Sequence, residues 1–163
     1  MSESELFAFE DDFVASLRCI PMAVRLRLDR SLIKLTLRQW SRLTIEDRRA
    51  LLDAPCSSAA EVERYRALLS AQVGLRCGES CRPLAEAPVP LWEARDRTPS
   101  AVADFARSVD VTPPSNGQWR GLSELQRFAL LKLSRDNHDN VNFIPAMREF
   151  GLLSTAATTA PDE

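Results

Sequence analysis

The sequence predicts an all-α fold, and three observations indicate this class. Only five of the 163 residues are glycine, whereas chains built of strands and tight turns need more of them. Hydroxyl residues that can start helices precede apolar stretches with helical spacing. One such stretch, residues 36–52, has a second version at residues 115–131. With 45% apolar residues, a chain of this length can bury a core without metal or disulfide cross-links.

The two related segments read TLRQWSRLTIEDRRALL and SNGQWRGLSELQRFALL, and they align without a gap. Each begins with a hydroxyl residue followed three positions later by glutamine, a capping box that starts a helix. A second helix start, at Thr44 or Ser123, follows eight residues later, so each segment predicts a short helix carrying a tryptophan and then a longer helix. We therefore predict two pseudo-repeated units in a single domain over residues 1–153. Four of their residues are assigned structural roles: Gln39, Trp40, Gln118 and Trp119.

Apolar spacing and cap residues predict four further helices. They cover residues 9–17, residues 58–73 ending before Gly74, residues 98–109, and residues 142–150. In the third of these, Thr98 is expected to be the N-cap and Pro99 the first helical residue.

Other stretches lack a helical pattern. Residues 24–28 and 32–37 alternate in polarity as strands do, but without a convincing partner strand we expect extended connectors. Residues 75–97 hold three prolines and are expected to connect the two units irregularly, with Trp92 attaching them to the body. Residues 154–163 are small and polar and are expected to form a disordered tail.

Charge and hydropathy exclude several function classes. The formal net charge of −2 argues against a protein that binds polyanions over its whole surface. Apolar runs fall far short of the ~20 residues of a membrane span, and the acidic N-terminus lacks the basic start of a signal peptide. Four cysteines without a secretory signal are expected to be reduced thiols. We therefore expect a cytoplasmic protein with no membrane or nucleic-acid partner.

Cys77 and Cys81 form the first candidate site. Structural zinc sites use four cysteine or histidine ligands, commonly spaced as CxxC, whereas this spacing is longer and the chain has one histidine. Redox pairs use a CxxC that opens a helix in a βαβ context, which is also missing from the pattern. We expect no metal and no cofactor, and a cysteine-based metal or redox protein is kept as a lower-ranked alternative.

Residues 134–143 form the second candidate site, a polar tract between two predicted helices. His138 could act as a general base if a nearby carboxylate oriented it, but no nucleophile or glycine-rich phosphate loop accompanies it. The tract therefore indicates a capping loop or a contact for a partner or ligand, and we expect no enzyme. The residues chosen for such a contact are Arg135, His138 and Asn142.

The third candidate site is a basic stretch, because residues 18–42 hold seven basic residues and one acid. Such a stretch could bind an acidic partner, a phosphate-bearing cofactor or nucleic acid. It could equally pair with the acidic N-terminus or lie solvated, since exposed ion pairs contribute little. The residues chosen here for a partner contact are Arg18 and Arg25.

These residues carry a family resemblance. Residues 9–13 (FEDDF), 17–22 (LRCIPM) and 126–135 (QRFALLKLSR), followed by His138 and residues 142–143, resemble the nitrate reductase-associated protein family. The resemblance covers about residues 7–153. Two features depart from the family pattern: the Ser31-Leu32 step, where a small-residue step is expected, and the Cys77–Cys81 tract.

The resemblance implies a non-enzymatic accessory protein, from a family of small soluble bacterial proteins often encoded beside assimilatory nitrate reductase and molybdopterin-cofactor genes. The implied partner is nitrate reductase or its maturation machinery, and the implied role is maturation, cofactor loading or support of activity through protein contact. One alternative is a module that binds nitrate, molybdate or a pterin phosphate, because arginine, asparagine and helix N-termini suit anions. The other is the cysteine-based protein described above.

Overall fold

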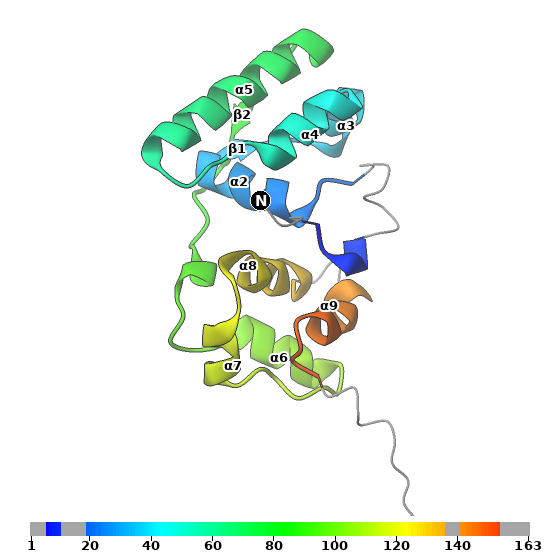
Figure 1. Ribbon diagram of the computed structural model, residues 1–163, viewed down its shortest axis with the longest axis vertical. Coiled ribbons are helices and arrows are strands. Elements are labelled where there is room, and N and C mark those ends of the chain that lie inside the picture. Colours follow the sequence, from blue (N-terminus) through cyan, green and yellow to red (C-terminus); the bar gives the residue numbers. More distant parts are fainter. Residues whose placement is uncertain (1–5, 11–18, 136–140, 154–163) are drawn as a thin grey trace, which may run out of the picture. The chain divides into compact units, whose positions relative to one another are not determined.

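A computed structural model describes residues 6–10, 19–135 and 141–153 (Figure 1). The described chain is mostly helical with one small sheet, so the predicted all-α class is confirmed. Its elements are η1 (Ala8–Glu10), α2 (Met22–Ser31), β1 (Ile33–Lys34), α3 (Leu37–Arg42), α4 (Ile45–Asp53), α5 (Ala59–Cys77), β2 (Arg82–Pro83), η2 (Leu91–Glu93), α6 (Ser100–Ser108), α7 (Asn116–Gly121), α8 (Glu124–Leu133) and α9 (Phe143–Glu149).

The chain divides into two compact units, Met1–Val89 and Pro90–Glu163. The two related segments lie in different units, since α3 and α4 belong to the first and α7 and α8 to the second. The prediction of a single domain over residues 1–153 stays a prediction, because it depends on how the two units are arranged.

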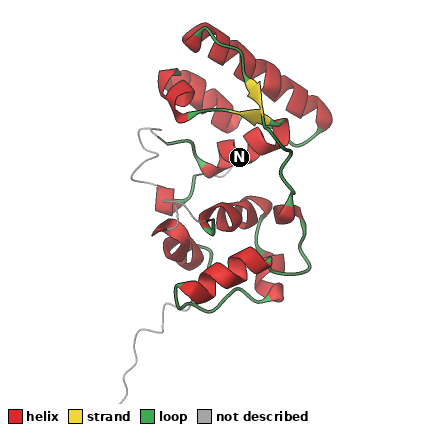
Figure 2. Cartoon of the chain, turned by 180° about the vertical axis from the view of Figure 1, so that it is seen from behind, coloured by secondary structure: helices red, strands yellow, loops and turns green. Residues whose placement is uncertain are grey.

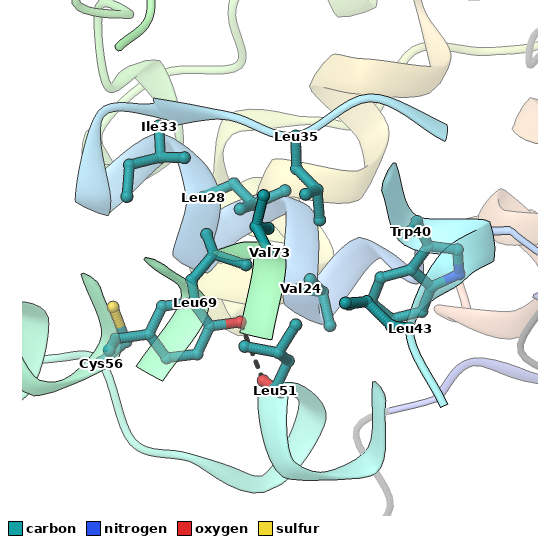
Figure 3. Close-up of a cluster of buried hydrophobic side chains, with 11 residues drawn as sticks. Val24, Leu28, Ile33, Leu35, Trp40, Leu43, Leu51, Cys56, Leu69 and Val73 are labelled. Carbon is teal, nitrogen blue, oxygen red and sulfur yellow. Dashed lines mark hydrogen bonds between the residues drawn. The ribbon is translucent and has the colours of Figure 1, made fainter. Parts of the chain in front are cut away.

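The core of the first unit is a cluster of buried apolar side chains from α2 to α5 (Figure 3). The helix α5 contributes Tyr65, Leu69 and Val73 to it and contacts α2, α3 and α4. Tyr65 Oη donates to the carbonyl oxygen of Leu51 at 2.9 Å. This bond satisfies the hydroxyl inside the core, so the tyrosine can be buried at little cost.

A short antiparallel pairing connects two separate parts of the first unit (Figure 2). β1 follows α2 and β2 follows α5; Ile33 pairs with Pro83, and Lys34 pairs with Arg82. We expected a connector over residues 32–37, and the structure instead places a two-residue strand there. The partner strand lies in the proline-containing stretch, where the local sequence gives no strand signal.

The core of the second unit is built around aromatic side chains. Trp92 of η2 meets Phe128 of α8 edge to face, with ring centroids 5.1 Å apart. Phe105 of α6 meets Phe143 of α9 in the same way at 4.8 Å. Such edge-to-face pairs add to the stabilisation from burial alone. Trp92 therefore attaches its irregular segment to a packed core, as predicted.

The four helix starts predicted for the related segments are all present, and each is a capping box in the structure. In the first, the Gln39 N–H donates to Thr36 Oγ1 at 3.0 Å, and the Thr36 N–H donates to Gln39 Oε1 at 3.1 Å. The corresponding box of the second segment, with Gln118, has the same two bonds. Trp40 and Trp119 are completely buried. The caps and the buried tryptophans agree with the prediction. That the two segments are copies of one repeated unit stays a prediction.

Residues 24–28 are helical, so the expectation of an extended connector was wrong. Val24, Leu26 and Leu28 alternate with arginines, but α2 buries Arg27 together with them. Alternation indicates a strand when one of the two sets faces solvent. The helix α2 is buried on several sides, so its alternation of apolar residues and arginines does not separate a buried face from a solvent-facing one.

The boundary predicted before Gly74 was also wrong. α5 continues through Gly74 to Cys77, and Gly78 ends it with a φ of 67°. An interior glycine costs a helix only about 1 kcal/mol relative to alanine, whereas a left-handed cap strongly favours glycine. The helix therefore ends at the glycine that can adopt the left-handed conformation.

The start of α6 differs from the prediction by one residue. Pro99 is the N-cap and Ser100 the first helical residue. The Thr98 hydroxyl, expected to cap the helix, donates instead to the carbonyl oxygen of Pro114 at 3.0 Å.

At the C-terminal side, the predicted last helix is present as α9. The predicted helix over residues 9–17 lies mostly in residues 11–18, outside the described residues, as does the predicted tail over residues 154–163.

Candidate functional site

Three of the five residues predicted to contact a partner are described by the structure. Arg25 lies half-buried in α2, and its Nε donates to the carbonyl oxygen of Ile20 at 3.1 Å. Arg135 is exposed after α8, and Asn142 is half-buried before α9. Arg25 belongs to the first unit and the other two to the second, so their membership of one surface stays a prediction. Arg18 and His138 lie outside the described residues.

The basic stretch divides into two parts in the structure. Its earlier part is used inside the first unit: Arg27 is only 8% exposed, and Arg30 Nη1 donates to the carbonyl oxygen of Cys56 at 3.4 Å. Guanidinium groups that bind backbone carbonyls of their own unit are poorly available to a partner. Only part of the basic stretch predicted over residues 18–42 is therefore available to a partner.

The later part of the stretch is exposed and gains a residue from β2. Lys34, Arg38 and Arg42 are exposed, and Arg82 lies directly opposite Lys34 across the β1–β2 pair. We call these four residues the basic surface. Like charges directly opposite on paired strands destabilise the pairing. Neither Lys34 nor Arg82 has an acidic partner among the described residues, so this positive charge is not balanced there.

Glu79 holds the helical side of the basic surface in place. Its Oε2 accepts from Gln39 Nε2 at 2.9 Å, and its Oε1 accepts a short hydrogen bond from Arg38. The bonds from Gln39 and then from Arg38 lower the pKa of Glu79. Because Glu79 precedes Arg82 by three residues, at most about 10 Å of chain separates them. The α3 side of the basic surface and the strand pair are thus neighbours.

An exposed apolar side chain adjoins the basic surface. Leu37, the first residue of α3, is 57% exposed and immediately precedes Arg38. A second one, Ile45 at the start of α4, is 52% exposed. Protein interfaces combine an apolar centre with a charged rim, so this arrangement suits a protein partner that offers acidic side chains.

Cys77 and Cys81, the first candidate site, lie beside the core of the first unit. All four cysteines lie in described residues and are free thiols. Burial raises the pKa of the Cys81 thiol, partly offset by a hydrogen bond with Ser70. A raised pKa leaves less thiolate, which is the reactive form.

Within residues 6–10, 19–135 and 141–153, no group of three or more potential ligand side chains is placed to hold a metal ion. Over the same ranges, every helix is too short or too polar to cross a bilayer.

Comparison with known protein families decides the wider relationship. Residues 6–150 match the family described as conserved nitrate reductase-associated protein. The chain belongs to this family. This match confirms the resemblance proposed from the sequence, and it extends over nearly the whole chain. Neither the curated proteins nor the solved structures gave a match.

Sequence reasoning missed one residue of this family member's basic surface, Arg82, and the apolar residue beside that surface, Leu37. Arg82 was assigned to an irregular connection, and Leu37 was assigned to a connector. Arg82 is separated from Lys34 by the whole of α4 and α5, so only the long-range strand pairing could reveal their proximity. Leu37 had a local signal, since it directly follows the predicted N-cap Thr36 and the first residue of a helix is often exposed.

Proposed function

We propose that the protein is a non-enzymatic accessory protein that binds nitrate reductase, or its apo-form, through the basic surface. Its role is to support maturation, cofactor loading or activity of the reductase in the cytoplasm. Membership of the nitrate reductase-associated family supports the partner. The observation that carries the choice of surface is the exposed Lys34–Arg82 pair, which has no acidic partner in the described chain.

An acidic partner surface would complement this pair. Opposite charges across an interface increase the association rate and exclude partners of the wrong charge. Leu37 adds apolar area beside the cations, and such area stabilises a complex once water is excluded. The proposal includes no catalytic step. The described acids with lowered pKa values serve helix caps and ion pairs, as Asp47 does with Arg76 at 2.8 Å.

A pull-down with assimilatory nitrate reductase tests the surface. The test variant carries Lys34→Glu together with Arg82→Glu. The control variant carries Arg107→Glu together with Arg148→Glu, and it makes the same change in net charge at exposed positions of α6 and α9 in the second unit. We expect the first double variant to lower retention about tenfold, and the control to lower it little. Retention of the unmodified protein should also fall as salt rises. Equal retention of both double variants would exclude the basic surface as the contact.

The residues predicted from the sequence need a separate variant. If the contact extends to them, Arg25→Ala with His138→Ala should lower retention as well. Unchanged retention would remove both residues from the site while leaving the basic surface assignment intact.

The role of the contact is tested in cells. A deletion strain is assayed for nitrate reductase activity and for reductase protein level. Reductase that is present but inactive supports maturation or cofactor loading, and reductase that is absent supports stabilisation. Normal activity at normal protein level would contradict the accessory role.

A further inference from the structure

We infer that Arg127 and Arg95, in the second unit, form a binding site for a small oxyanion. This inference is independent of the proposed contact with nitrate reductase. Arg127 lies in α8 and is only 5% exposed. It makes no ion pair with any acid in the described residues.

Two of the three guanidinium nitrogens of Arg127 have partners. Nε donates to the carbonyl oxygen of Trp92 at 2.6 Å, and Nη1 donates a short hydrogen bond to the carbonyl oxygen of Leu122. The third nitrogen, Nη2, makes no hydrogen bond to the described chain, and it is not fully enclosed by protein atoms. Nη2 therefore reaches solvent through the small exposed part of the side chain, where a ligand could bind it.

A second cation belongs to the same part of the unit, since the carbonyl oxygens of Arg120 and Leu122, which bind Arg95 and Arg127, are two residues apart. Burial and the positive charge of Arg95 lower the pKa of Arg127. Arg95 itself is exposed and is held by a bond from its Nη2 to the carbonyl oxygen of Arg120 at 3.4 Å. Arginine remains charged despite such shifts. The second unit thus holds a desolvated cation and a nearby like charge, both of which an anion would stabilise.

The aligned arginine of the first unit shows what a purely structural role looks like. Arg48 is half-buried, donates from Nε to the carbonyl oxygen of Trp40 at 3.1 Å, and lies over the Trp40 ring. Arg127 also binds backbone carbonyls, which ties α8 to the preceding segments. It differs in its deeper burial and in the second arginine beside it.

The geometry indicates the class of ligand. Only one edge of the Arg127 guanidinium is available, and Arg95 supplies a second set of donors from the surface. Charge-assisted bonds from two guanidinium groups suit the several acceptor oxygens of one small oxyanion. Because Arg127 reaches solvent through a small opening, a small anion fits the site better than a large one.

Thermal unfolding of the full chain tests the site. Inorganic phosphate is the first probe, titrated at constant ionic strength with chloride as the replaced anion; sulfate, molybdate and nitrate follow, to separate tetrahedral from planar ligands. We expect a saturable rise in Tm of about 5 °C for the anion that fits, at concentrations well above its Kd. Arg95→Ala should keep the ligand-free Tm and raise the half-saturating concentration about tenfold.

Two further variants complete the test. Arg127→Lys keeps the charge and loses the planar edge, so it should also weaken the response, whereas Arg48→Lys should respond as the unmodified chain does. If Arg127→Lys does not fold, the comparison of Arg95→Ala with Arg48→Lys still decides. The site is excluded if no anion gives a saturable rise. It is also excluded if Arg95→Ala and Arg48→Lys respond equally, which would indicate a general salt effect.

Discussion

Two buried tryptophans of the second unit differ in the state of their indole nitrogen. Trp119 Nε1 donates to the carbonyl oxygen of Ala94 at 2.8 Å. Trp92 Nε1 is buried but has no acceptor among the described residues. A buried donor without an acceptor loses its bond to water and gains nothing in exchange. The two residues therefore contribute differently to stability, although both rings are packed.

Replacing each tryptophan by phenylalanine should show this difference. Both substitutions remove a similar part of the ring, but Trp119→Phe also leaves the carbonyl of Ala94 unpaired. Trp92→Phe instead removes an unsatisfied donor. We expect Trp119→Phe to lower the free energy of unfolding by about 1–3 kcal/mol more than Trp92→Phe does. Urea denaturation followed by far-UV circular dichroism measures both variants, and an equal loss would show that the missing acceptor has no energetic effect.

At this scale, sequence reasoning found the residues whose role is local. Gln39 and Gln118 could be assigned because a capping box is defined by residues three apart. Trp40 and Trp119 could be assigned because each occupies the same position in its related segment. Arg82 and Glu79 could not be assigned to a surface, since their neighbours are brought to them by long-range pairing.

At the scale of the elements, starts of helices were easier to predict than ends. A start depends on a hydroxyl side chain and the next turn, which can be read directly, and the five boxes at Thr36, Thr44, Ser58, Ser115 and Ser123 are all present. The ends of α2 and α5 depend on which residue adopts the left-handed conformation, which the sequence alone does not mark. Leu32 illustrates the same point: it caps α2 with a φ of 56°. That position is where the resemblance led us to expect a small-residue step, and the sequence has Ser31-Leu32 instead.

The two glycines near the end of α5 should respond to the same substitution in opposite directions. Gly74 lies inside the helix, Gly78 has a φ of 67°, and an added methyl group would meet no atom within 4 Å at either site. Gly74→Ala should therefore raise the free energy of unfolding by about 0.5–1 kcal/mol. Gly78→Ala should lower it by about 1–2 kcal/mol, the cost of a left-handed backbone. Thermal or urea unfolding checks both signs, and the same sign for both would contradict the assigned end of α5.

At the scale of the whole molecule, the fold class was predictable and the division of the chain was not. Helical spacing and caps are local properties, so they indicate an all-α chain without any knowledge of packing. Whether the related segments share one core depends on contacts between distant residues. In the structure, the first unit has its own buried cluster, whose members all lie between Val24 and Val73. The partly buried side chains packed against this cluster extend from Leu6 to Cys81.

This self-contained cluster predicts that residues 1–89 fold without the rest of the chain. A segment of this size can bury enough apolar surface to be stable, and Trp40 is its one tryptophan. We expect the isolated segment to show the blue-shifted fluorescence of a buried indole, lost in one cooperative urea transition. Leu51→Ala, at a fully buried position, should lower the midpoint, since such a change typically costs about 2–5 kcal/mol. Solvent-exposed fluorescence without a transition would mean that the first unit needs residues 90–163, and would favour a single core over two.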